Sequence, residues 1–371
     1  MILAVDCETT GLDAFHGCRP FLITACDGNK NYYWWGRVDP YTRNVTWDRE
    51  VLDEIQALLD KAYRIVTHNG NFDLRMFEYI GLDISKIHDK LEDILVASHA
   101  ICSADEHGLK PLCEKYLDMR NLDEVRLETA TKAAIIVARK LGYAVAKFGH
   151  PHFPALKKQG TEWWKMDYWL APDECLEYAL LDVERTLRLW WIFQHELMAC
   201  NLWEVYRKRI ELLKVAYDMQ TRGKYFYVNQ TTDLLHSLKK DIEQHQFNIR
   251  RLSGIQYRFE HTKSSHLIDL IHNRLGIPIK YYTTGKNPKP STAKDAIKAY
   301  IKEYDFPALR ELQAIKRKSK KITDIQSITL WLDKDHRTHS NLNITGTRET
   351  RQSSSNPNDQ NVDRTLKYLF G

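Results

Sequence analysis

The chain opens with MILAVDCETTGL (residues 1–12), and this stretch decides how the rest of the sequence is interpreted. Its first five residues are apolar and predict a buried strand, and the polar and glycine residues that follow are turn signals. Asp6 and Glu8 alternate along the strand, so their side chains project from the same face. Two carboxylates this close repel each other unless a cation lies between them, so the stretch predicts a metal site.

The segments around this strand predict a mixed sheet. RPFLITACDG (19–28) and KNYYWWGRV (30–38) predict two strands of an antiparallel hairpin beside the first strand. WDREVLDEIQALLDKAY (47–63) has apolar residues at helical spacing, and RIVTHNGNFDLRMFEYIG (64–81) predicts a strand, a loop and a helix. This alternation is typical of the α/β class, with helices on both faces of the sheet.

The clearest helix prediction is APDECLEYALLDVERTLRLWWIFQHELM (171–198), where proline and two acids mark the beginning and no glycine interrupts the pattern. The preceding stretch, residues 121–167, is less legible, and we expect a loop-rich insertion at its centre, around FGHPHFPALKKQG (148–160). Beyond residue 200 the pattern predicts a helix that ends at Gly223, a short strand, and long basic amphipathic helices over 229–251 and 306–327.

Charge is segregated along the chain. The 371 residues carry a net charge of +5, but residues 1–200 hold 23 Lys and Arg against 31 Asp and Glu, whereas residues 201–330 hold 25 against 13. An acidic half beside a basic half indicates metal-dependent chemistry next to a surface that binds a polyanion, although charge alone does not separate DNA from RNA.

Composition excludes several classes of protein. The opening residues are too short an apolar run for a signal peptide, and no apolar run is long enough to cross a membrane, so we expect a cytoplasmic protein. The seven cysteines form no C-x-x-C pair, which favours free thiols in a reducing compartment over disulfides or a zinc site.

Two further blocks supply the residues that a phosphodiester-cleaving site needs. Asp73 lies in HNGNFDLRMF (68–77), and Tyr178 and Asp182 lie in YALLDVERT (178–186), four residues apart and therefore on one helical face. Hydrolysis by paired metals requires three or four carboxylates around two cations, and a phenol can hold the attacking water. Each block alone is weak evidence, since an acid pair, a helix cap or a Tyr-x-x-x-Asp spacing arises by chance; together and in order they predict a nuclease.

With these residues, the first 200 positions resemble the DEDD-type, RNase H-like 3′–5′ exonuclease domain of family A DNA polymerases, in its tyrosine-bearing subclass. The matching residues are Asp6, Glu8, Thr9 and Leu12 for the first motif, Asn69, Phe72 and Asp73 for the second, and Tyr178 and Asp182 for the third. HDKLEDILVASHAI (88–101) and HGLKPLCEKYL (107–117) are similar to the connecting segments.

The resemblance implies a role for each of these positions. Asp6, Glu8 and Asp182 would hold one Mg²⁺ or Mn²⁺, and Asp6 and Asp73 the second. Glu8 and Tyr178 would act in catalysis, and Thr9, Leu12 and Asn69 would contact the terminal nucleotides of a single-stranded 3′ end. Asp93 is left out of the metal set because it can equally be a local structural acid.

The second half resembles the thumb and the palm entry of the same polymerases. KPSTAKDAI (289–297) and LRELQAIKRKSKKITDI (309–325) are similar to the thumb, which implies phosphate contacts on primer–template duplex for Lys316, Arg317 and Lys318. HSNLNITGTRETRQSSSNPNDQNV (339–362) is close to the palm-entry signature, which implies a duplex contact for Arg351. Asp359 and Asp363 depart from that signature. Without the resemblance, a solvated basic face is the preferred interpretation of the thumb-like lysines.

We therefore expect a 3′–5′ exonuclease domain over residues 1–200, a thumb-like region over 201–335 and an incomplete palm over 336–371. The polymerase motifs that follow the palm entry are not in the sequence, so we expect no DNA synthesis from this chain alone, and either a split phage-type polymerase with a second polypeptide or a truncated one. The alternative functions are a DNA-binding and assembly subunit and, less favoured, a stand-alone RNA exonuclease.

Overall fold

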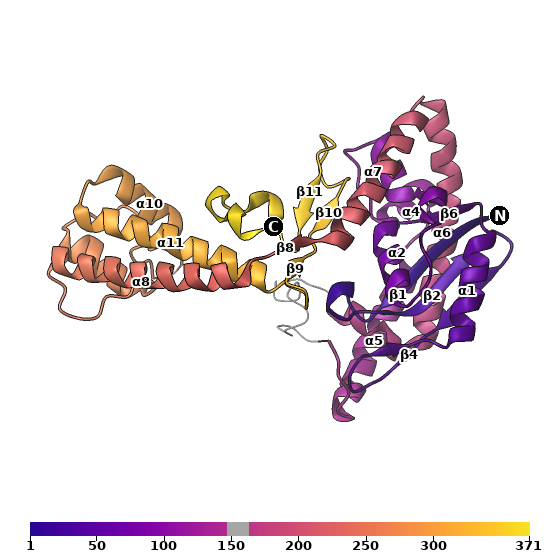
Figure 1. Cartoon of the computed structure of the whole chain (residues 1–371), viewed down its shortest axis with the longest axis horizontal. Coiled ribbons are helices and arrows are strands. Elements are labelled where there is room, and N and C mark those ends of the chain that lie inside the picture. The colour runs from indigo at the N-terminus through magenta and orange to yellow at the C-terminus, as the bar shows by residue number, and fades with distance from the viewer. Residues whose placement is uncertain (147–162, 286) are drawn as a thin grey trace. The chain divides into compact units, whose positions relative to one another are not determined.

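The computed structural model describes residues 1–146, 163–285 and 287–371, and the chain divides into two compact units (Figure 1). Unit 1 comprises residues 1–223 and 339–360, and unit 2 comprises residues 224–338 and 361–371. The predicted loop-rich insertion around FGHPHFPALKKQG lies outside the described residues. None of the described helices is long and apolar enough to span a membrane.

Unit 1 is built on a five-stranded sheet with the order β3-β2-β1-β6-β7. The strands are β1 (Ile2–Thr9), β2 (Pro20–Cys26), β3 (Asn31–Trp35), β6 (Arg64–Thr67) and β7 (Leu91–Asp93). β1 runs antiparallel to β2 and parallel to β6, and β6 runs parallel to β7. The predicted mixed sheet and the predicted β2–β3 hairpin are therefore confirmed.

The sheet holds β1 in its middle, so the strand that carries the first two acids is paired on both edges. Its first half, Leu3 to Val5, is fully buried, as the apolar run requires. Further along, Asp6 lies opposite Thr24 and Glu8 opposite Leu22, and the register shifts between Glu8 and Thr9. Such irregularities re-aim side chains at strand ends, and here the irregularity follows the two acids directly.

Seven α-helices surround this sheet among the described residues of unit 1. They are α1 (Arg49–Lys61), α2 (Gly70–Tyr79), α3 (Ile94–Ile101), α4 (Leu109–Leu117), α5 (Leu122–Lys140), α6 (Pro172–Ala199) and α7 (Trp203–Arg222). Shorter elements complete the unit: η1 (Ala14–His16), β4 (Arg37–Val38), β5 (Val45–Thr46), η2 (His88–Lys90), η4 (Trp163–Leu170), β10 (Asn341–Asn343), β11 (Ser353–Ser355) and η6 (Asp359–Asn361), whose last residue falls in unit 2.

The long helix α6 lies against β1 and β2. Pro172 occupies its first turn, where the missing N–H has no partner to lose, and Asp173 and Glu174 complement the helix dipole there. The Thr24 hydroxyl on β2 donates to the carbonyl of Ala179 at 3.3 Å, which ties the first turns of α6 to the sheet. This contact positions the helix that carries the third predicted block.

Unit 1 extends beyond the predicted boundary at residue 200 because α7 packs into the same core as β1. Tyr206, Ile210 and Tyr217 on α7 are buried there, and the Tyr206 hydroxyl donates to Glu92 on β7 at 2.7 Å. α7 ends at Gly223, whose positive φ of 62° closes the helix without a side-chain penalty.

The segment 339–360, predicted as part of an incomplete palm, packs in unit 1 instead of forming a separate body. The Gln220 amide of α7 donates to Asn341 at 3.1 Å, and His99 of α3 contacts the carbonyl of Thr347 at 3.0 Å. The His339 ring stacks on Phe15 with centroids 3.6 Å apart. The compact units therefore divide the chain differently from the predicted ranges 1–200, 201–335 and 336–371.

Unit 2 is mainly helical. Its elements are β8 (Lys224–Tyr225), α8 (Val228–Ser253), α9 (Ser264–Ile268), η5 (Asp269–Arg274), α10 (Lys294–Glu303), α11 (Pro307–Thr329), β9 (Arg337–Thr338) and η7 (Arg364–Leu369). The two long helices, α8 and α11, pack together along their length, as their predicted amphipathic patterns require (Figure 1).

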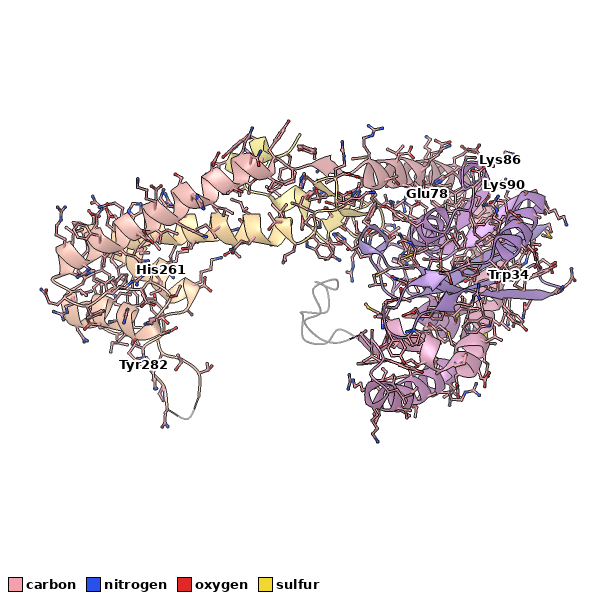
Figure 2. The ribbon with its side chains drawn as sticks, turned by 60° about the horizontal axis from the view of Figure 1, so that its bottom comes forward. Trp34, Glu78, Lys86, Lys90, His261 and Tyr282 are labelled. Atoms are coloured by element: carbon pink, nitrogen blue, oxygen red, sulfur yellow. The ribbon has the colours of Figure 1, made fainter. Side chains whose placement is uncertain are left out.

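A histidine links this helix pair to the connection between them. His261 contacts Gln246 of α8 through Nδ1 and Ser319 of α11 through Nε2, each at 3.0 Å (Figure 2). Burial lowers the pKa of His261, so the ring is neutral at pH 7 and each nitrogen has one hydrogen-bond partner. Tyr282, in contrast, lies exposed in the loop before α10 (Figure 2).

Candidate active site

The three predicted blocks come from three elements of unit 1. Asp6 and Glu8 lie on β1, Asp73 lies in the first turn of α2, and Tyr178 and Asp182 lie on α6. Asp73 and Asp182 are buried, whereas Asp6 and Glu8 are half-buried. The fold thus brings residues 170 positions apart in the sequence into one region.

The four carboxylates act on one another electrostatically. Burial, followed by repulsion from Asp182, raises the pKa of Asp6 from 3.8 to about 7. Burial raises the pKa of Glu8 well above its usual value, and Asp6 and Asp182 add to that shift. The pKa of Asp73 is raised by burial and then by Asp6. Carboxylates that hinder each other's ionisation in this way are poised to accept cations.

Asp73 is oriented by the residue between the two strand acids. The backbone N–H of Cys7 donates to Asp73 Oδ1 at 3.2 Å, and the Cys7 thiol donates to the same oxygen at 3.1 Å. Burial and then Asp73 raise the pKa of this thiol, so it stays protonated and remains a donor. Both contacts reach one oxygen, and among the described residues no hydrogen bond is made to Oδ2.

The turn before α2 is built for a close approach of backbone and side chains. Asn69 adopts the left-handed conformation, with φ of 69°, which asparagine tolerates better than most residues. Gly70 has no room for a side chain, because an added Cβ would lie 2.2 Å from the Thr67 hydroxyl. Its N–H donates to Asp93 at 2.7 Å.

Asp93 has a structural part in this turn. Besides Gly70, its carboxylate accepts from the backbone of Leu95 and Val96, and it thereby caps α3. These three backbone donors account for its burial. Asp93 therefore stabilises the turn before α2 and the start of α3.

Asp182 is flanked by two cations, one from α4 and one from its own helix α6. Lys110 of α4 donates to Asp182 Oδ1, and Arg185, one turn further along α6, donates to the same oxygen at 3.0 Å. Arg185 also forms a two-pronged pair with Asp123 of α5, at 2.6 and 2.7 Å. Lys110 lies 3.6 Å from Asp123. Two acids and two cations therefore form a buried network.

Tyr178 lies at the edge of this network. The Lys110 ammonium lies over its ring, 4.1 Å from the centroid, and Tyr168 packs edge-on at 5.9 Å. Burial and then the charges of Asp182 and Glu8 raise the pKa of Tyr178 well above 10, so the phenol keeps its proton. A protonated phenol beside the acids can donate a hydrogen bond to a water or a phosphate oxygen.

The donor chemistry of the cluster fits divalent cations. The four carboxylates supply the hard oxygen ligands that Mg²⁺ and Mn²⁺ prefer, and the raised pKa values of Asp6, Glu8 and Asp73 indicate too little positive charge nearby. As the side chains stand in the part of the chain that the structure describes, no three His, Cys, Asp or Glu residues form a ready ligand group. Metal binding would therefore require these side chains to close in, and the two-cation assignment stays a prediction.

The residues of unit 1 that are predicted to contact nucleic acid differ in exposure. Leu12 and Arg351 are exposed, and the Asn69 side chain is exposed and makes no capping hydrogen bond. Thr9 is buried, and its hydroxyl donates to the carbonyl of Gly11 at 2.8 Å, which shapes the turn after β1. None of these four contacts is tested by the structure.

The predicted phosphate-binding residues of unit 2 differ from one another. Arg317 is exposed on α11, whereas Lys316 is half-buried and burial lowers its pKa. Lys318 forms an ion pair with Asp241 of α8 at 2.5 Å. Arg317 is therefore the most accessible of the three, and all three remain predictions as DNA contacts.

Four residues around the cluster were missed by the sequence reasoning: Cys7, Lys110, Asp123 and Arg185. Lys110 and Arg185 do stand inside segments that the sequence singled out, and Arg185 follows Asp182 at helical spacing. That spacing is a usable signal for an ion pair. Nothing local marks Asp123, because Arg185, with which it forms two hydrogen bonds, is 62 residues away.

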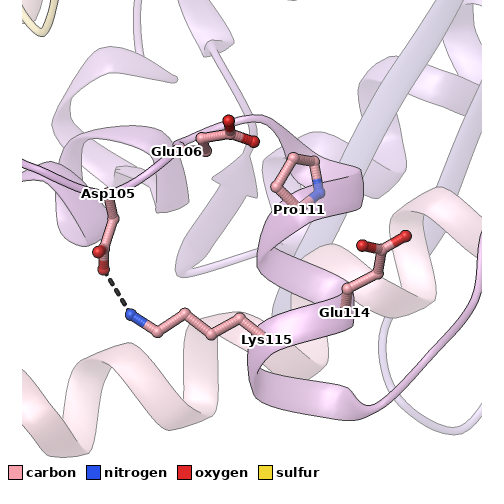
Figure 3. A pocket seen from close by; sticks show the side chains of 5 residues that line it. All are labelled: Asp105, Glu106, Pro111, Glu114 and Lys115. Atoms are coloured by element: carbon pink, nitrogen blue, oxygen red, sulfur yellow. Dashed lines mark hydrogen bonds and ion pairs between the residues drawn. The ribbon is translucent and has the colours of Figure 1, made fainter.

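A separate pocket opens beside α4. It is lined by Asp105, Glu106, Pro111, Glu114 and Lys115, and Lys115 pairs with Asp105 at 2.5 Å (Figure 3). None of the four clustered carboxylates lines this pocket. Its acids are at the surface, and we assign no chemistry to it.

The N-terminal region of the chain matches a known protein family. Residues 2–147 match the family model of the DNA polymerase A exonuclease domain, described as a 3′–5′ exonuclease. That range contains Asp6, Glu8 and Asp73 and ends before the third block. The resemblance of the N-terminal region to this exonuclease domain is therefore confirmed.

The similar curated proteins are DNA polymerases. The chain is 25% identical to DNA polymerase DpoZ of Salmonella phage PMBT28 over 317 residues, which cover 80% of this chain and 43% of that protein. It is 23% identical to DNA polymerase DpoZ of Acinetobacter phage SH-Ab 15497, over 68% of this chain and 36% of that protein. DNA polymerase I of Rhizobium leguminosarum is 24% identical over 85% of this chain and 28% of its own length. The chain thus spans less than half the length of these relatives.

A solved structure shares the fold of the whole chain. The polymerase domain of Pol1 from M. smegmatis, in complex with DNA primer–template and dNTP, superposes with a TM-score of 0.64 at 14% identity. The match covers 99% of this chain and 53% of that one. Together with the exonuclease match, it confirms the predicted fold class, an RNase H-like mixed sheet followed by a helical region.

Proposed function

We propose that this chain is a 3′–5′ exonuclease that removes nucleotides from DNA ends with the help of two divalent cations. The observation that carries the proposal is the convergence of Asp6, Glu8, Asp73 and Asp182, in which burial and mutual repulsion raise the pKa of Asp6 to about 7. Such a cluster of carboxylates is unfavourable without added positive charge. Carboxylates also repel the phosphates of a DNA end, unless a cation lies between them.

Asp6, Glu8 and Asp182 would hold one cation, and Asp6 and Asp73 the other. When bound, Mg²⁺ or Mn²⁺ supplies activation of water and neutralisation of the charge that develops on phosphate. Asp6 would be shared between the two positions, which agrees with its repulsion from Asp182 and its effect on Asp73. The Cys7 contacts would hold Asp73 Oδ1 and leave Oδ2 for the cluster.

The remaining roles belong to polar groups around the cluster. The Tyr178 hydroxyl, kept protonated, would orient the attacking water, and Glu8 would accept a hydrogen bond from that water. Water adds to phosphorus, the P–O3′ bond breaks, and the leaving oxygen takes a proton. The products are a nucleoside 5′-monophosphate and a strand with a new 3′ hydroxyl.

The DNA end would be held by Asn69 and Leu12. Both are exposed beside the elements that carry the acids, one before α2 and the other after β1. An exposed leucine can pack against a terminal base, and an amide can donate to sugar or phosphate. Thr9 would shape the turn that presents Leu12.

The test is stepwise shortening of a single strand labelled at its 5′ end, with Mg²⁺ present. We expect the wild type to shorten the strand from the 3′ end and an Asp6→Ala, Glu8→Ala variant to lose at least about a thousandfold in rate, since removing the acids removes the cations. Asp105→Asn, which changes a surface acid outside the cluster, serves as the matched control. Equal rates for wild type and the double variant would overturn the proposal.

A second candidate function is binding of primer–template duplex as part of a DNA polymerase. The observation that favours it is the basic character of residues 201–330, with 25 Lys and Arg against 13 Asp and Glu, a range that covers α7 and most of unit 2. Palm and finger sequences would then come from the same or a second polypeptide, in the cytoplasm where DNA is copied. The two functions are compatible.

Salt-dependent binding to duplex, retained in the Asp6→Ala, Glu8→Ala variant, would support this second candidate. Restored DNA synthesis on mixing with a chain that carries the palm motifs would support the assembly role. Failure to bind duplex at low salt would exclude both, and would leave the exonuclease proposal untouched.

A further inference from the structure

The network around Asp182 divides its hydrogen bonds unevenly. Lys110 and Arg185 both reach Oδ1 of Asp182, and among the described residues no hydrogen bond is made to Oδ2. Arg185 directs its two terminal nitrogens toward Asp123 at 2.6 and 2.7 Å and only one of them toward Asp182, at 3.0 Å. The arginine is thus paired primarily with Asp123.

This division follows from the geometry of guanidinium. The planar group forms its strongest pair with a carboxylate through two parallel N–H donors, and the edge that carries its two terminal nitrogens can pair in this way with one carboxylate at a time. Asp123 and Arg185 are almost fully buried, with side-chain exposures of 4% and 3%, so water does not weaken their pairing. With Asp123 in place, the edge of Arg185 that carries both terminal nitrogens is occupied and is not available to Asp182.

Without the charge of Asp123 the same arginine would have a single carboxylate partner. Two buried cations would then face one acid, and Arg185 would gain by turning both donors onto Asp182, including Oδ2. That oxygen is the one that a cation needs. The pair would also bring a net positive charge to the place where a divalent cation is expected.

We propose that Asp123 is a positioning residue for the metal site: it holds Arg185, and in part Lys110, so that Oδ2 of Asp182 stays open to a divalent cation. The inference rests on the proposed function and deepens it. Asp123 itself does not touch the cation or the DNA. Its effect is transmitted through Arg185 to Asp182.

The test is Mn²⁺ binding to the whole chain, measured by calorimetry and by the loss of the free-ion electron paramagnetic resonance signal. Asp123→Asn keeps the shape of the side chain and removes its charge, and we expect affinity to fall about 10- to 100-fold, as is usual when the partner of a metal ligand is changed. Glu128→Gln is the matched control. It removes an acid from the same helix that pairs with exposed Lys132 instead of with Arg185 or Lys110, and we expect unchanged affinity.

A compensating variant separates positioning from general damage. Asp123→Asn combined with Arg185→Met removes the arginine that would otherwise turn onto Asp182, so we expect Mn²⁺ affinity to return to within about threefold of wild type. Neutral side chains of similar size often replace a buried ion pair without loss of stability. If Asp123→Asn alone does not fold, the double variant decides, because it restores the charge balance.

Wild-type affinity in folded Asp123→Asn, or a double variant that binds Mn²⁺ as weakly as the single one, would overturn the inference. In either case the proposed function would stand, provided that Asp6→Ala, Glu8→Ala still abolishes Mn²⁺ binding. If wild type and Asp6→Ala, Glu8→Ala bind Mn²⁺ equally, the proposed function fails, and this inference fails with it.

Discussion

Unit 1 buries charged groups, whereas unit 2 keeps them at its surface. In unit 1 the Arg43–Asp167 pair is buried, and so is the network of Asp123, Arg185 and Asp182. In unit 2 the Arg310–Asp305 pair is exposed on both sides. The core of unit 2 consists of apolar residues between α8, α10 and α11.

The difference shows which interactions stabilise each unit and which ones lower its free energy of unfolding. Burying an acid without enough positive charge costs free energy, and unit 1 accepts that cost at Asp6, Glu8 and Asp73. Exposed ion pairs contribute little, so unit 2 depends on packing between its helices. The four changes that follow act on one unit or the other, in order of expected size.

Tyr178→Phe should have the largest effect, and only on activity. The variant loses the hydroxyl donor but keeps the ring that packs with Lys110 and Tyr168. We expect the single-turnover rate to fall about 10²- to 10⁴-fold, the usual range for a lost proton-handling group. Mn²⁺ affinity should not change, and a control variant at the exposed Tyr33 of β3, Tyr33→Phe, should cleave at the wild-type rate. A full-rate Tyr178→Phe enzyme would remove the tyrosine from the mechanism.

Leu312→Ala should destabilise unit 2 without affecting the acid cluster. Leu312 is fully buried in the core between the helices of unit 2, and truncation of a buried leucine costs about 2–5 kcal/mol. Urea unfolding followed by circular dichroism measures the loss. Leu330→Ala, at an exposed position just after α11, is the control. A change in Mn²⁺ affinity would contradict the separation between packing in unit 2 and charge in unit 1.

Asp6→Asn should stabilise the metal-free protein at high pH. The folded-state pKa of Asp6 is about 7 against an ordinary 3.8, so the favourable, protonated form persists at low pH and its stability is lost as pH rises from about 4 through 7. A shift of this size corresponds to at most about 4 kcal/mol.

In EDTA at pH 8 the Asp6→Asn variant should therefore unfold at a higher temperature than wild type, and at pH 4 the two should agree. Asp53→Asn, which changes an exposed acid on α1, should show no such trend. If wild type and Asp6→Asn have the same stability at pH 8, the acid cluster is not strained by its own charge.

Arg317→Gln should have the smallest effect, on duplex binding. Arg317 is exposed on α11, and loss of one phosphate contact reduces the slope of log affinity against log salt by about one. Lys318→Gln should change the slope less, because Lys318 already pairs with Asp241. Fluorescence anisotropy with labelled duplex at several salt concentrations measures both. Equal effects of the two variants would show that the ion pair with Asp241 does not keep Lys318 from contacting phosphate.

Much of the fold could be predicted because its signals are local. The apolar run before Asp6, the hairpin that follows it and the uninterrupted pattern of α6 each contain enough residues of one period to identify the element. The long helices of unit 2 were predicted from the same kind of pattern. Because these elements were predicted correctly, the sequence also placed Asp6 and Glu8 on a strand and Asp182 on a helix.

Helix α5 was harder to predict for a physical reason. Its buried face consists of Leu127, Thr131, Ile135 and Ala138 together with Asp123, so polar and small residues interrupt the apolar stripe that a sequence pattern depends on. The charges at its two ends, acids first and bases last, were the remaining signal. The partners of Asp123 could not be predicted, because they depend on how α4, α5 and α6 meet.

The boundary between the two units was also beyond the sequence pattern. The change in charge near residue 200 does mark a change in composition, but the buried face of α7, with Tyr206, Ile210 and Leu213, completes the core of unit 1. Packing of one face decides to which unit a helix belongs, and composition averages over both faces.

The return of residues 339–360 to unit 1 has a consequence for synthesis of the protein. All of unit 2 except its last residues is translated between α7 and the segment that completes unit 1. The nascent exonuclease region therefore waits for more than a hundred residues before Gln220, His99 and Phe15 meet their last partners. A fragment ending at Gly223 would leave those side chains uncovered, and we expect it to be recovered from cells in lower yield than the intact polypeptide.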